Sequence, residues 1–516
     1  MLANPNRWVA LGVLCLAELL VMVDNTIVNV ALPTISRDLS ASTTGLQWVV
    51  DAYTLAFAGL LLAGGYVGDR YGRRRALLAG IAAFGAVSAV AASSTSLGEL
   101  IAARAALGVF ASLVFPATLA LLTNLFADAK ERAAAVGIWG ATSGVAIAIG
   151  PVLGGALLEH FSWSSVFWVN VPFAIVVVAA VLIAVPADRG GHAAPFDALG
   201  VLLSIAGVSL LVYTVIEGPH RGWWTASTVL GFIGAAIVLA AFVMRELRTP
   251  HPILDVRLFT NRLFATSSGM IAIAFFSLFG FIFLITQYMQ AVKGYDPLEA
   301  GVRTLPFAIV VAVVSPLAIV AARWIGAGIT VGIGSGLMSM GFAVALTADR
   351  GASYWGLILP SMCLMAAGLA LIQGPATSII MDSLEPHQAG AGSAVNDTTR
   401  EIGGTLGVAV LGSVLASLYG TQVDSRLAGL GLPADAEHAA RTSVMAGVEV
   451  AQRVPGQAGT FVLHAVQDSF VDGLHRALWA AIIVTAMGVP TAWTLLRTRR
   501  QPAVEAAAGE RELVDA

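Results

Sequence analysis

The sequence predicts an all-helical protein that crosses a membrane many times. Hydrophobic residues make up 57% of the 516 residues and charged residues only 11%, far below the roughly 25% of charged residues in soluble domains. Fourteen apolar runs are each long enough to cross a bilayer, which takes about 20 residues in a helix. An arginine-rich loop after the second run indicates which side of the membrane is cytoplasmic. We therefore expect fourteen transmembrane helices with both termini in the cytoplasm.

The orienting loop spans residues 65–75 and reads GYVGDRYGRRR. Its arginines cannot lie in hydrocarbon, and an excess of Lys and Arg in a short loop marks the cytoplasmic side of a membrane. Asp69 can cap the helix that follows or pair with one of the arginines. Gly65, Gly68 and Gly72 permit tight backbone turns and close helix approach.

The fourteen apolar runs follow one another along the chain, and their even number places both ends on one side. The loops predicted to be cytoplasmic carry most of the positive charge and the short outer loops carry little, as the positive-inside rule requires. The first run is too long and too acidic for a cleaved signal peptide, so we expect it to stay in the membrane. The runs lie near residues 8–31, 46–66, 76–94, 98–126, 133–157, 166–185, 197–216, 226–244, 264–290, 303–322, 326–347, 355–378, 400–419 and 477–496.

The spans divide as six, two and six, and transporters are often built from such repeated halves. Residues 1–190 form the first six-helix bundle, and residues 191–262 add two transmembrane helices with their linkers. Residues 263–516 form the second six-helix bundle and a cytoplasmic tail. A long extracytoplasmic loop is expected over residues 420–476. Its segment AEHAARTSVMAGVEVAQ is either a short amphipathic helix or a solvated spacer.

The linker after the eighth span carries apolar residues at helical spacing. Ile253, Leu254, Leu258 and Phe259 would share one face of a helix. An amphipathic helix of this kind lies along a membrane surface. We therefore predict a helix on the cytoplasmic surface that joins the two halves.

The first span contains polar groups that are costly to bury in a bilayer, at roughly 2.5 to 3.5 kcal/mol for each charged side chain. Glu18, Asn25 and Asn29 share one helical stripe, while Asp24 lies about 120° away from Glu18. Both faces should therefore meet protein or water. Asp24 and Glu18 are each either functional carboxyls or members of a permanent hydrogen-bond network.

Two further ionisable residues fall inside predicted spans. Arg104 keeps its positive charge at any physiological pH, and it would stabilise the ionised form of a carboxylate beside it. If that pairing alternates, it offers a route to proton release; the alternative is a static link between helices. Asp51 either lines an outer cavity or begins a helix.

The fifth span is rich in glycine. Gly140, Gly144 and Ala148 form a stripe of small residues that lets another helix come close. The run GPVLGG at residues 150–155 predicts a kink and a second close contact. Helices that slide or rock against each other need such a surface.

The thirteenth span begins with a cluster of charged residues. Asp397 and Arg400 can pair at i,i+3, whereas Asp397 and Glu401 at i,i+4 would repel if both were ionised. One of the two carboxyls would then bind a proton. Alternatively, the whole cluster lies in water at the cytoplasmic mouth.

These residues resemble a branch of the major facilitator superfamily, the fourteen-span drug:proton antiporters. The loop at 65–75 is similar to the family signature G-x-L-a-D-R-x-G-R-k, with Val67 in place of leucine. Residues 24–33 match the first-span signature D-x-T-I-V-N-V-A-L-P. Residues 100–108 resemble the fourth-span pattern l-x-x-x-R-x-x-q-G, although Leu107 replaces glutamine.

Two more patterns support the resemblance, which covers about residues 8–498. Residues 146–155 resemble the antiporter pattern g-x-x-x-G-P-x-x-G-G, with alanine for the first glycine. Residues 163–172 resemble W-R-W-x-F-x-x-N-x-P, with Ser164 and Ser165 where the family has arginine and tryptophan. Any role of those two family residues does not carry over to this chain.

The resemblance implies a major facilitator fold and an exporter of lipophilic or amphipathic compounds, such as drugs, antibiotics or cationic dyes, in exchange for protons. It assigns Asp24 to proton coupling or cation recognition and Arg104 to proton transfer. With the residues singled out above, the candidates form four groups. They are a proton-coupling and substrate cavity (Asp24, Arg104, Glu18, Asn25, Asp51), a cytoplasmic gate (Gly65, Asp69, Arg70, Gly72, Arg73), an antiporter bend (Gly150, Pro151, Gly154, Gly155) and a second-half polar cluster (Asp397, Arg400, Glu401).

No enzyme activity, cofactor or metal site is expected, because the chain has no nucleophile elbow, no H-E-x-x-H motif and no phosphate loop. The proton gradient would supply the energy. The expected partners are a lipophilic small molecule, protons and the bilayer, without nucleic acid, and the chain should act as a monomer. A transporter of the same fold with one narrow substrate, such as a natural product, siderophore, peptide or lipid, is the alternative function.

The composition also suggests where the protein resides. Ala, Gly, Val and Arg are favoured over Lys, Asn and Ile, which indicates a GC-rich bacterial genome. We therefore expect a multi-pass protein of a bacterial inner (plasma) membrane.

Overall fold

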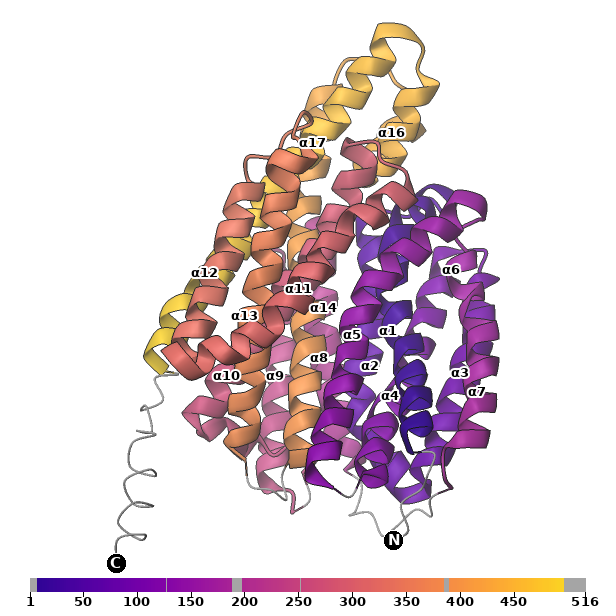
Figure 1. The fold of residues 1–516 in the computed structure, drawn as a ribbon. Coiled ribbons are helices and arrows are strands. Elements are labelled where there is room, and N and C mark those ends of the chain that lie inside the picture. The colour runs from indigo at the N-terminus through magenta and orange to yellow at the C-terminus, as the bar shows by residue number, and fades with distance from the viewer. Residues whose placement is uncertain (1–6, 127, 188–196, 251, 385–388, 496–516) are drawn as a thin grey trace, which may run out of the picture.

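A computed structural model describes residues 7–126, 128–187, 197–250, 252–384 and 389–495. Fourteen helices in these ranges are long and apolar enough to cross a membrane, which confirms the predicted spans (Figure 1). Short elements connect or extend them. The helices are α1 (Arg7–Asp38), α2 (Thr43–Tyr71), α3 (Arg73–Ala92), α4 (Leu97–Leu125), α5 (Ala129–His160), α6 (Ser165–Trp168), α7 (Asn170–Ala184), α8 (Ala198–Arg221), α9 (Ala226–Arg248), η1 (Val256–Thr260), α10 (Arg262–Gln287), η2 (Tyr288–Val292), α11 (Pro297–Ile325), α12 (Ala327–Ala345), η3 (Tyr354–Ile358), α13 (Leu359–Asp382), α14 (Ala389–Leu427), α15 (Ala434–Thr442), α16 (Val444–Arg453) and α17 (Gly456–Leu495).

The helices form two bundles that lie side by side. Helices α1 to α7 make the first bundle, and α10 to α14 with α17 make the second (Figure 1). The bundles meet mainly along two pairs of helices, α2 with α14 and α5 with α11, and α1 makes smaller contacts with α10 and α11. Helices α8 and α9 pack against each other as a hairpin, and α8 contacts both α2 and α14.

Gly72 makes the turn in the arginine-rich loop. Its φ of 103° joins the end of α2 directly to the start of α3, and its backbone N–H donates to the carbonyl of Gly68. Asp69 pairs with Arg73 at 2.8 Å, one of the two alternatives that the sequence left open. The same arginine donates from Nη1 to the carbonyl of Ala120 on α4 at 3.2 Å. The loop is therefore held by its own ion pair and by a neighbouring helix.

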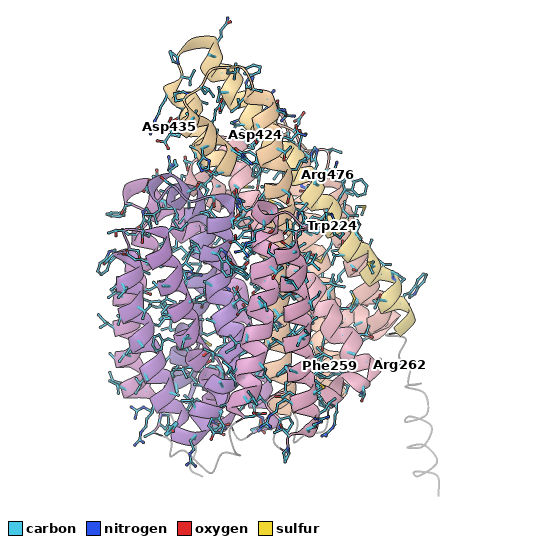
Figure 2. The ribbon with its side chains drawn as sticks, turned by 180° about the vertical axis from the view of Figure 1, so that it is seen from behind. Trp224, Phe259, Arg262, Asp424, Asp435 and Arg476 are labelled. Carbon is cyan, nitrogen blue, oxygen red and sulfur yellow. The ribbon has the colours of Figure 1, made fainter. Side chains whose placement is uncertain are left out.

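The expected outer loop at residues 420–476 is helical over most of its length, which corrects the prediction. Helix α14 continues to Leu427, α17 begins at Gly456, and α15 and α16 lie between them. These outer helices rise above the rest of the molecule in Figures 1 and 2. A hydropathy window cannot detect helices that continue into water, because their exposed residues are polar.

The segment is also neither a solvated spacer nor one amphipathic helix. Helix α16 buries Val444 and Val450 against the core. The hydroxyls of Ser443 and Ser36 are 2.7 Å apart, and this hydrogen bond ties the segment to α1. The outer helices therefore pack on both bundles.

The predicted surface helix at 253–259 is wrong in type. The chain forms only the short 3₁₀ helix η1, and Asp255 caps it by accepting from the backbone N–H of Arg257 at 3.1 Å. Leu254 and Leu258 pack against the core, while Phe259 is exposed. Periodicity over so few residues does not distinguish a 3₁₀ turn from an α-helix.

The strained turn leads to a test of stability. A side chain at Gly72 would be forced into a sparsely populated backbone region, so Gly72→Ala should destabilise the protein by about 1 to 3 kcal/mol. Gly98→Ala is the matched control, because Gly98 lies in α4 with nothing within 4 Å of the added carbon. Thermal unfolding of the purified protein in detergent should show a lower midpoint for Gly72→Ala only. Equal midpoints would contradict this account of the turn.

Candidate functional site

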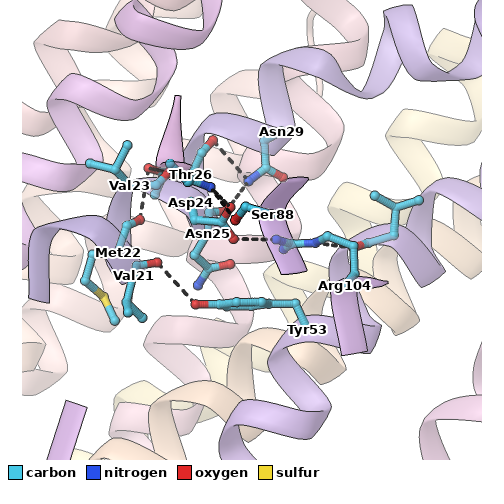
Figure 3. Close-up of polar contacts among 12 residues, drawn as sticks. Val21, Met22, Val23, Asp24, Asn25, Thr26, Asn29, Tyr53, Ser88 and Arg104 are labelled. Atoms are coloured by element: carbon cyan, nitrogen blue, oxygen red, sulfur yellow. Dashed lines mark hydrogen bonds and ion pairs between the residues drawn. The ribbon is translucent and has the colours of Figure 1, made fainter. Parts of the chain in front are cut away.

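A fully buried ion pair lies at the centre of the first bundle. Arg104 on α4 donates from Nη1 to Oδ2 of Asp24 on α1 at 2.5 Å, and neither side chain has any exposed surface. The other carboxylate oxygen accepts from Nδ2 of Asn170 on α7 at 2.7 Å (Figure 3). The same amide lies 3.3 Å from the hydroxyl of Ser88 on α3. The Asp24 carboxylate is thus held by charge-assisted hydrogen bonds from two other helices.

The guanidinium of Arg104 is held on its other sides by α2. Its Nε donates to the carbonyl of Val49 at 3.0 Å, and the Tyr53 ring lies 4.3 Å from the guanidinium carbon, within cation–π range. The Tyr53 hydroxyl donates to the carbonyl of Val21 on α1 at 3.2 Å (Figure 3). Among the described residues, Arg104 Nη2 has no hydrogen-bond partner. One donor of the buried cation is therefore available for another acceptor.

A mostly apolar cavity lies between the two bundles, with about 580 Å³ of empty space that includes its opening to solvent. Its polar groups are hydroxyls and an amide, and no charged side chain lies among its lining residues. Helices α1 and α5 form one wall, and α10 with its continuation η2, α11 and α13 form the other. The lining residues are Thr26, Asn29, Val30, Ile147, Pro151, Phe281, Ile282, Ile285, Thr286, Met289, Ala300, Thr304, Phe307 and Met362.

The outer half of α5 makes the close contacts that its glycines predicted. A Cβ at Gly150 would collide with the side chain of Thr26, and one at Gly154 would lie 2.9 Å from Ile27. Gly155 faces α11, where a Cβ would lie 2.5 Å from the Cα of Leu298. Pro151 lies within α5, which continues as one helix, and its carbonyl packs on Gly301. This segment therefore contacts α1 and α11 together.

The remaining part of the predicted small-residue stripe is not packed. Among the described residues, Gly140 and Gly144 have nothing within 4 Å of an added Cβ, so no described helix makes a close contact there in this conformation. The expectation of a close contact there is wrong for this state, because α5 and α11 meet only toward their outer ends. The tight packing begins near Gly150.

Comparisons with known proteins agree with this geometry. Residues 14–408 match the Major Facilitator Superfamily. The chain belongs to this superfamily. The multidrug efflux pump LfrA of Mycolicibacterium smegmatis is 37% identical over 94% of this chain and 95% of its own length. The methyl viologen resistance protein SmvA of Salmonella typhimurium is 34% identical over 94% of this chain and 98% of its own. The tetracenomycin C resistance and export protein of Streptomyces glaucescens is 31% identical over 94% and 91%.

Solved structures show the same fold. A bacterial homologue of the human lysosomal transporter Spinster superposes with a TM-score of 0.69 at 17% sequence identity. The match covers 97% of this chain and 100% of that one. The protein is thus a multi-pass membrane protein with the major facilitator fold, and its named relatives are transporters.

Two residues that were predicted to share a cavity with the ion pair, Glu18 and Asp51, lie apart from that pair in the structure. Glu18 is buried on α1, about two turns nearer the cytoplasm than Asp24. Asp51 is buried in the third turn of α2, so it does not begin a helix, and it does not line the cavity described above. Neither oxygen of the Asp51 carboxyl has a hydrogen-bond partner within the described ranges. Asn25 lies next to the pair, and its carbonyl accepts from Nδ2 of the cavity residue Asn29 at 3.1 Å.

The predicted second-half cluster forms near the start of the thirteenth span. Arg400 Nη1 lies 3.6 Å from Asp397 Oδ1, and Nη2 of the same arginine donates to the hydroxyl of Thr377 at 3.3 Å. The side chains of Asp397 and Arg400 are 14% and 21% exposed, and Glu401 is buried. The cluster is therefore mostly buried and does not lie in open water.

The predicted gate residues occupy the cytoplasmic turn described above, and their gating role stays a prediction. Arg70 is exposed there. A Cβ at Gly65 would make an ordinary 3.6 Å contact with Pro116, whereas one at the neighbouring Gly64 would collide with the backbone of Ser112. Gly64 therefore allows the close approach of α2 and α4 that was expected of Gly65.

Sequence reasoning missed Asn170 and Tyr53, which complete the surroundings of the ion pair. Asn170 lies in the 163–172 run, in which the sequence analysis assigned significance only to the two serine substitutions. An amide at the start of an apolar span was the available signal, because a buried amide needs a partner. Tyr53 left no comparable signal, since a tyrosine in a span most often packs by its ring alone.

A double-mutant cycle tests whether the two charges depend on each other. Arg104→Gln should lower stability by about 3 to 5 kcal/mol, because it leaves the Asp24 carboxylate buried without its cation. The double variant Asp24→Asn/Arg104→Gln should lose much less than the sum of the single variants. Thermal unfolding in detergent measures the stability of each variant. The control is Arg453→Gln, which breaks an exposed ion pair and is expected to lose under about 1 kcal/mol of stability. Additive losses would show that the pair is not coupled.

A second test concerns the contact between α5 and α11. Gly155→Val should keep the outer ends of these helices apart, so that a cysteine placed at Met289 in the cavity reacts several-fold faster with an impermeant maleimide added outside intact cells. Gly137→Val is the control, because Gly137 has nothing within 4 Å. Cys15 and Cys363 are first replaced by serine. Equal reaction rates in the two variants would show that the contact between α5 and α11 does not close the cavity.

Proposed function

We propose that this superfamily member exports lipophilic small molecules in exchange for protons, by alternating access, across the inner membrane of a bacterium. The observation that supports it most is the position of the buried pair relative to the cavity. Asp24 lies on the same helix as Thr26 and Asn29, which line the cavity. A change of charge at Asp24 therefore occurs within one or two helical turns of a bound substrate.

The contacts of α1 provide a route from proton binding to the movement of the two halves. A proton on Asp24 would remove the charge that attracts Arg104 and would weaken both of the hydrogen bonds that the carboxylate accepts. Two residues later, the hydroxyl of Thr26 donates to the carbonyl of Ala146 on α5 at 3.1 Å. Helix α5 in turn makes the outer contact with α11. Proton binding would thus bias a contact between the halves, which is how alternating access is coupled to an ion.

Two further buried carboxyls lie between the bundles. Asp51 on α2 shares a helix face with Thr54, whose hydroxyl is 2.8 Å from that of Thr405 on α14. Glu401 lies one turn before Thr405. A bound proton would remove the high cost of burying charge at either carboxyl. We propose that these two groups take part in proton exchange together with Asp24.

The cavity suits large apolar compounds that carry few hydrogen-bonding groups. Aromatic rings and thioethers adapt to different shapes, because methionine is flexible and polarisable, and Phe281, Phe307, Met289 and Met362 all line it. Relatives named as multidrug pumps support a broad range of substrates. The named exporters of tetracenomycin C and cephamycin support the narrow alternative, a single natural product. Because the whole cavity lies within one chain, we propose that a monomer is sufficient.

Transport into inverted vesicles tests the proposal. One proton moving down 100 mV supplies about 2.3 kcal/mol, so an acid-inside gradient should drive a fluorescent lipophilic cation into vesicles that contain the natural protein. Asp24→Asn should reduce this accumulation to the level of empty vesicles while the protein still inserts. Asp435→Asn, the same change on the exposed outer helix α15, should retain full transport.

The outcomes separate the two candidate functions. Dye accumulation that needs both the gradient and Asp24 supports a proton-driven exporter of broad range. Full accumulation by Asp24→Asn would remove Asp24 from the coupling mechanism. If the natural protein accumulates none of a panel of cationic and neutral dyes, the narrow natural-product exporter becomes the better proposal.

A further inference from the structure

The second bundle contains a cavity of its own, which we call the inner chamber. Its walls are α10 with η2, the end of α12 and the turn after it, η3, the start of α13 and the middle of α17. These elements pack together in the second bundle (Figure 1). The inner chamber has about 330 Å³ of empty space that includes its opening to solvent. All of its lining residues lie between Phe281 and Leu478, so it is distinct from the cavity between the bundles.

Two side chains separate the inner chamber from the cavity between the bundles. Phe281 and Ile285, one turn apart on α10, line both spaces. The ring centroid of Phe281 lies 6.5 Å from that of Phe307, which lines the cavity between the bundles, and 6.3 Å from that of Phe342 on α12. Because there is empty space on both sides of it, the Phe281 ring can turn without moving a helix. The two spaces are therefore separated by a single layer of side chains.

The lining of the inner chamber is apolar. Among its lining residues only Tyr288 and Ser361 have polar side chains, and both are buried. The Tyr288 hydroxyl donates to the carbonyl of Asp349 at 2.6 Å, and the Ser361 hydroxyl donates to the carbonyl of Ile358 at 2.8 Å. Neither hydroxyl has a second proton to donate to a ligand. A polar group without a partner is costly to bury, so the inner chamber favours a ligand group that makes no hydrogen bonds.

Two π-helical turns border the inner chamber. In η2 the backbone N–H of Lys293 donates to the carbonyl of Tyr288, five residues earlier, at 3.1 Å. In η3 the N–H of Ile358 donates to the carbonyl of Ser353 in the same way at 3.2 Å. These are the two π-helical turns in the described part of the chain, and each supplies lining residues of this one space. Such turns are rare and frequently lie at functional sites. Their position therefore indicates that the inner chamber has a function.

The size of the inner chamber limits what it can hold. Pockets that bury a whole drug-sized molecule have volumes of about 300 to 1,000 Å³. The inner chamber lies at the lower end of this range even with its opening included. It therefore has room for part of such a molecule, while the larger cavity on the other side of Phe281 has room for the rest.

We propose that the inner chamber is a second part of the substrate site and receives an apolar arm, alkyl or aryl, of a substrate whose remainder lies in the cavity between the bundles. The Phe281 ring turns aside to admit this arm. This inference rests on the proposed export function. It adds a property of the preferred substrates, which are elongated compounds with one end free of hydrogen-bonding groups.

Photolabelling of the full-length protein in liposomes tests the inner chamber without requiring transport. The probes are triphenylphosphonium cations with a diazirine at the end of a propyl or a decyl chain, and labelled residues are located by mass spectrometry. The decyl probe should label residues 474–478 of α17, a helix that lines the inner chamber but not the other cavity. The propyl probe should label α1 or α5, which line only the cavity between the bundles. Excess tetraphenylphosphonium should suppress both labels.

Equilibrium binding of the same two cations gives the second readout. Ala348→Phe fills the inner chamber, and Ala343→Phe adds the same ring on the exposed face of α12 as the matched control. The ratio of decyl to propyl affinity should be about tenfold lower in Ala348→Phe than in Ala343→Phe, equivalent to about 1.4 kcal/mol or roughly two buried methylenes. Partition of the decyl chain into lipid is the same for both variants. Unchanged binding of the propyl cation shows that Ala348→Phe is folded.

The outcomes keep this inference separate from the export proposal. Equal affinity ratios in the two variants would overturn the inner chamber as a substrate site. Decyl labelling that is confined to α1 and α5, or labelling of α17 that the competitor does not suppress, would overturn it as well, the latter because a lipid-like chain would then enter independently of the substrate site. If the natural protein transports neither cation, the export proposal fails, while competable labelling of α17 still supports the inner chamber as a binding site.

Discussion

The ion pair between Asp24 and Arg104 is the interaction on which the first bundle depends. Hydrocarbon offers no partner to a charge, so each member of the pair needs the other. Their neighbours extend the requirement to five helices, because α1, α2, α3, α4 and α7 all supply an atom to the pair or to its partners. The same contacts that fix these helices also place the carboxylate beside the cavity. Stability and the proposed coupling therefore use one set of atoms.

A few helices also make most of the contacts between the two bundles. Glycines of α5 allow α1 and α11 to touch one helix at nearly the same level, so a shift of α1 can reach the second bundle through α5 as well as through its own contacts with α10 and α11. On the opposite side, the α8–α9 hairpin stays in contact with both bundles. Under the proposed alternating access, α8 would have to slide over α2 or over α14. Ile205 of α8 packs on Gly59, which has no side chain to obstruct such a movement.

Much of this architecture was predictable from the sequence. Fourteen apolar runs gave fourteen helices, because a helix is the only way for a single segment to cross lipid with its backbone bonds satisfied. The importance of Asp24 and Arg104 followed from the cost of burying charge. Their direct pairing did not, since two positions far apart in the chain meet only through the packing of α1 and α4. The contact of Asn170 with the pair and the existence of the cavity could not be predicted for the same reason.

The errors have physical causes as well. A hydropathy window detects only apolar segments. It therefore did not predict α15, α16 or the more polar outer parts of α14 and α17. Glycine spacing predicts where a helix can approach, but the conformation decides whether it does, as Gly144 shows. A helix start was one of the two alternatives for Asp51, yet Ser42 caps α2 about two and a half turns earlier.

The outer helices have one more consequence. They rise above the rest of the molecule in Figures 1 and 2, and they touch α1 through Ser443 and Ser36. An antibody fragment raised against the junction of α16 with α1 would add ordered mass on this side of the molecule. It would also select one state from a mixed population, because its epitope exists only while the outer ends of the two bundles are together.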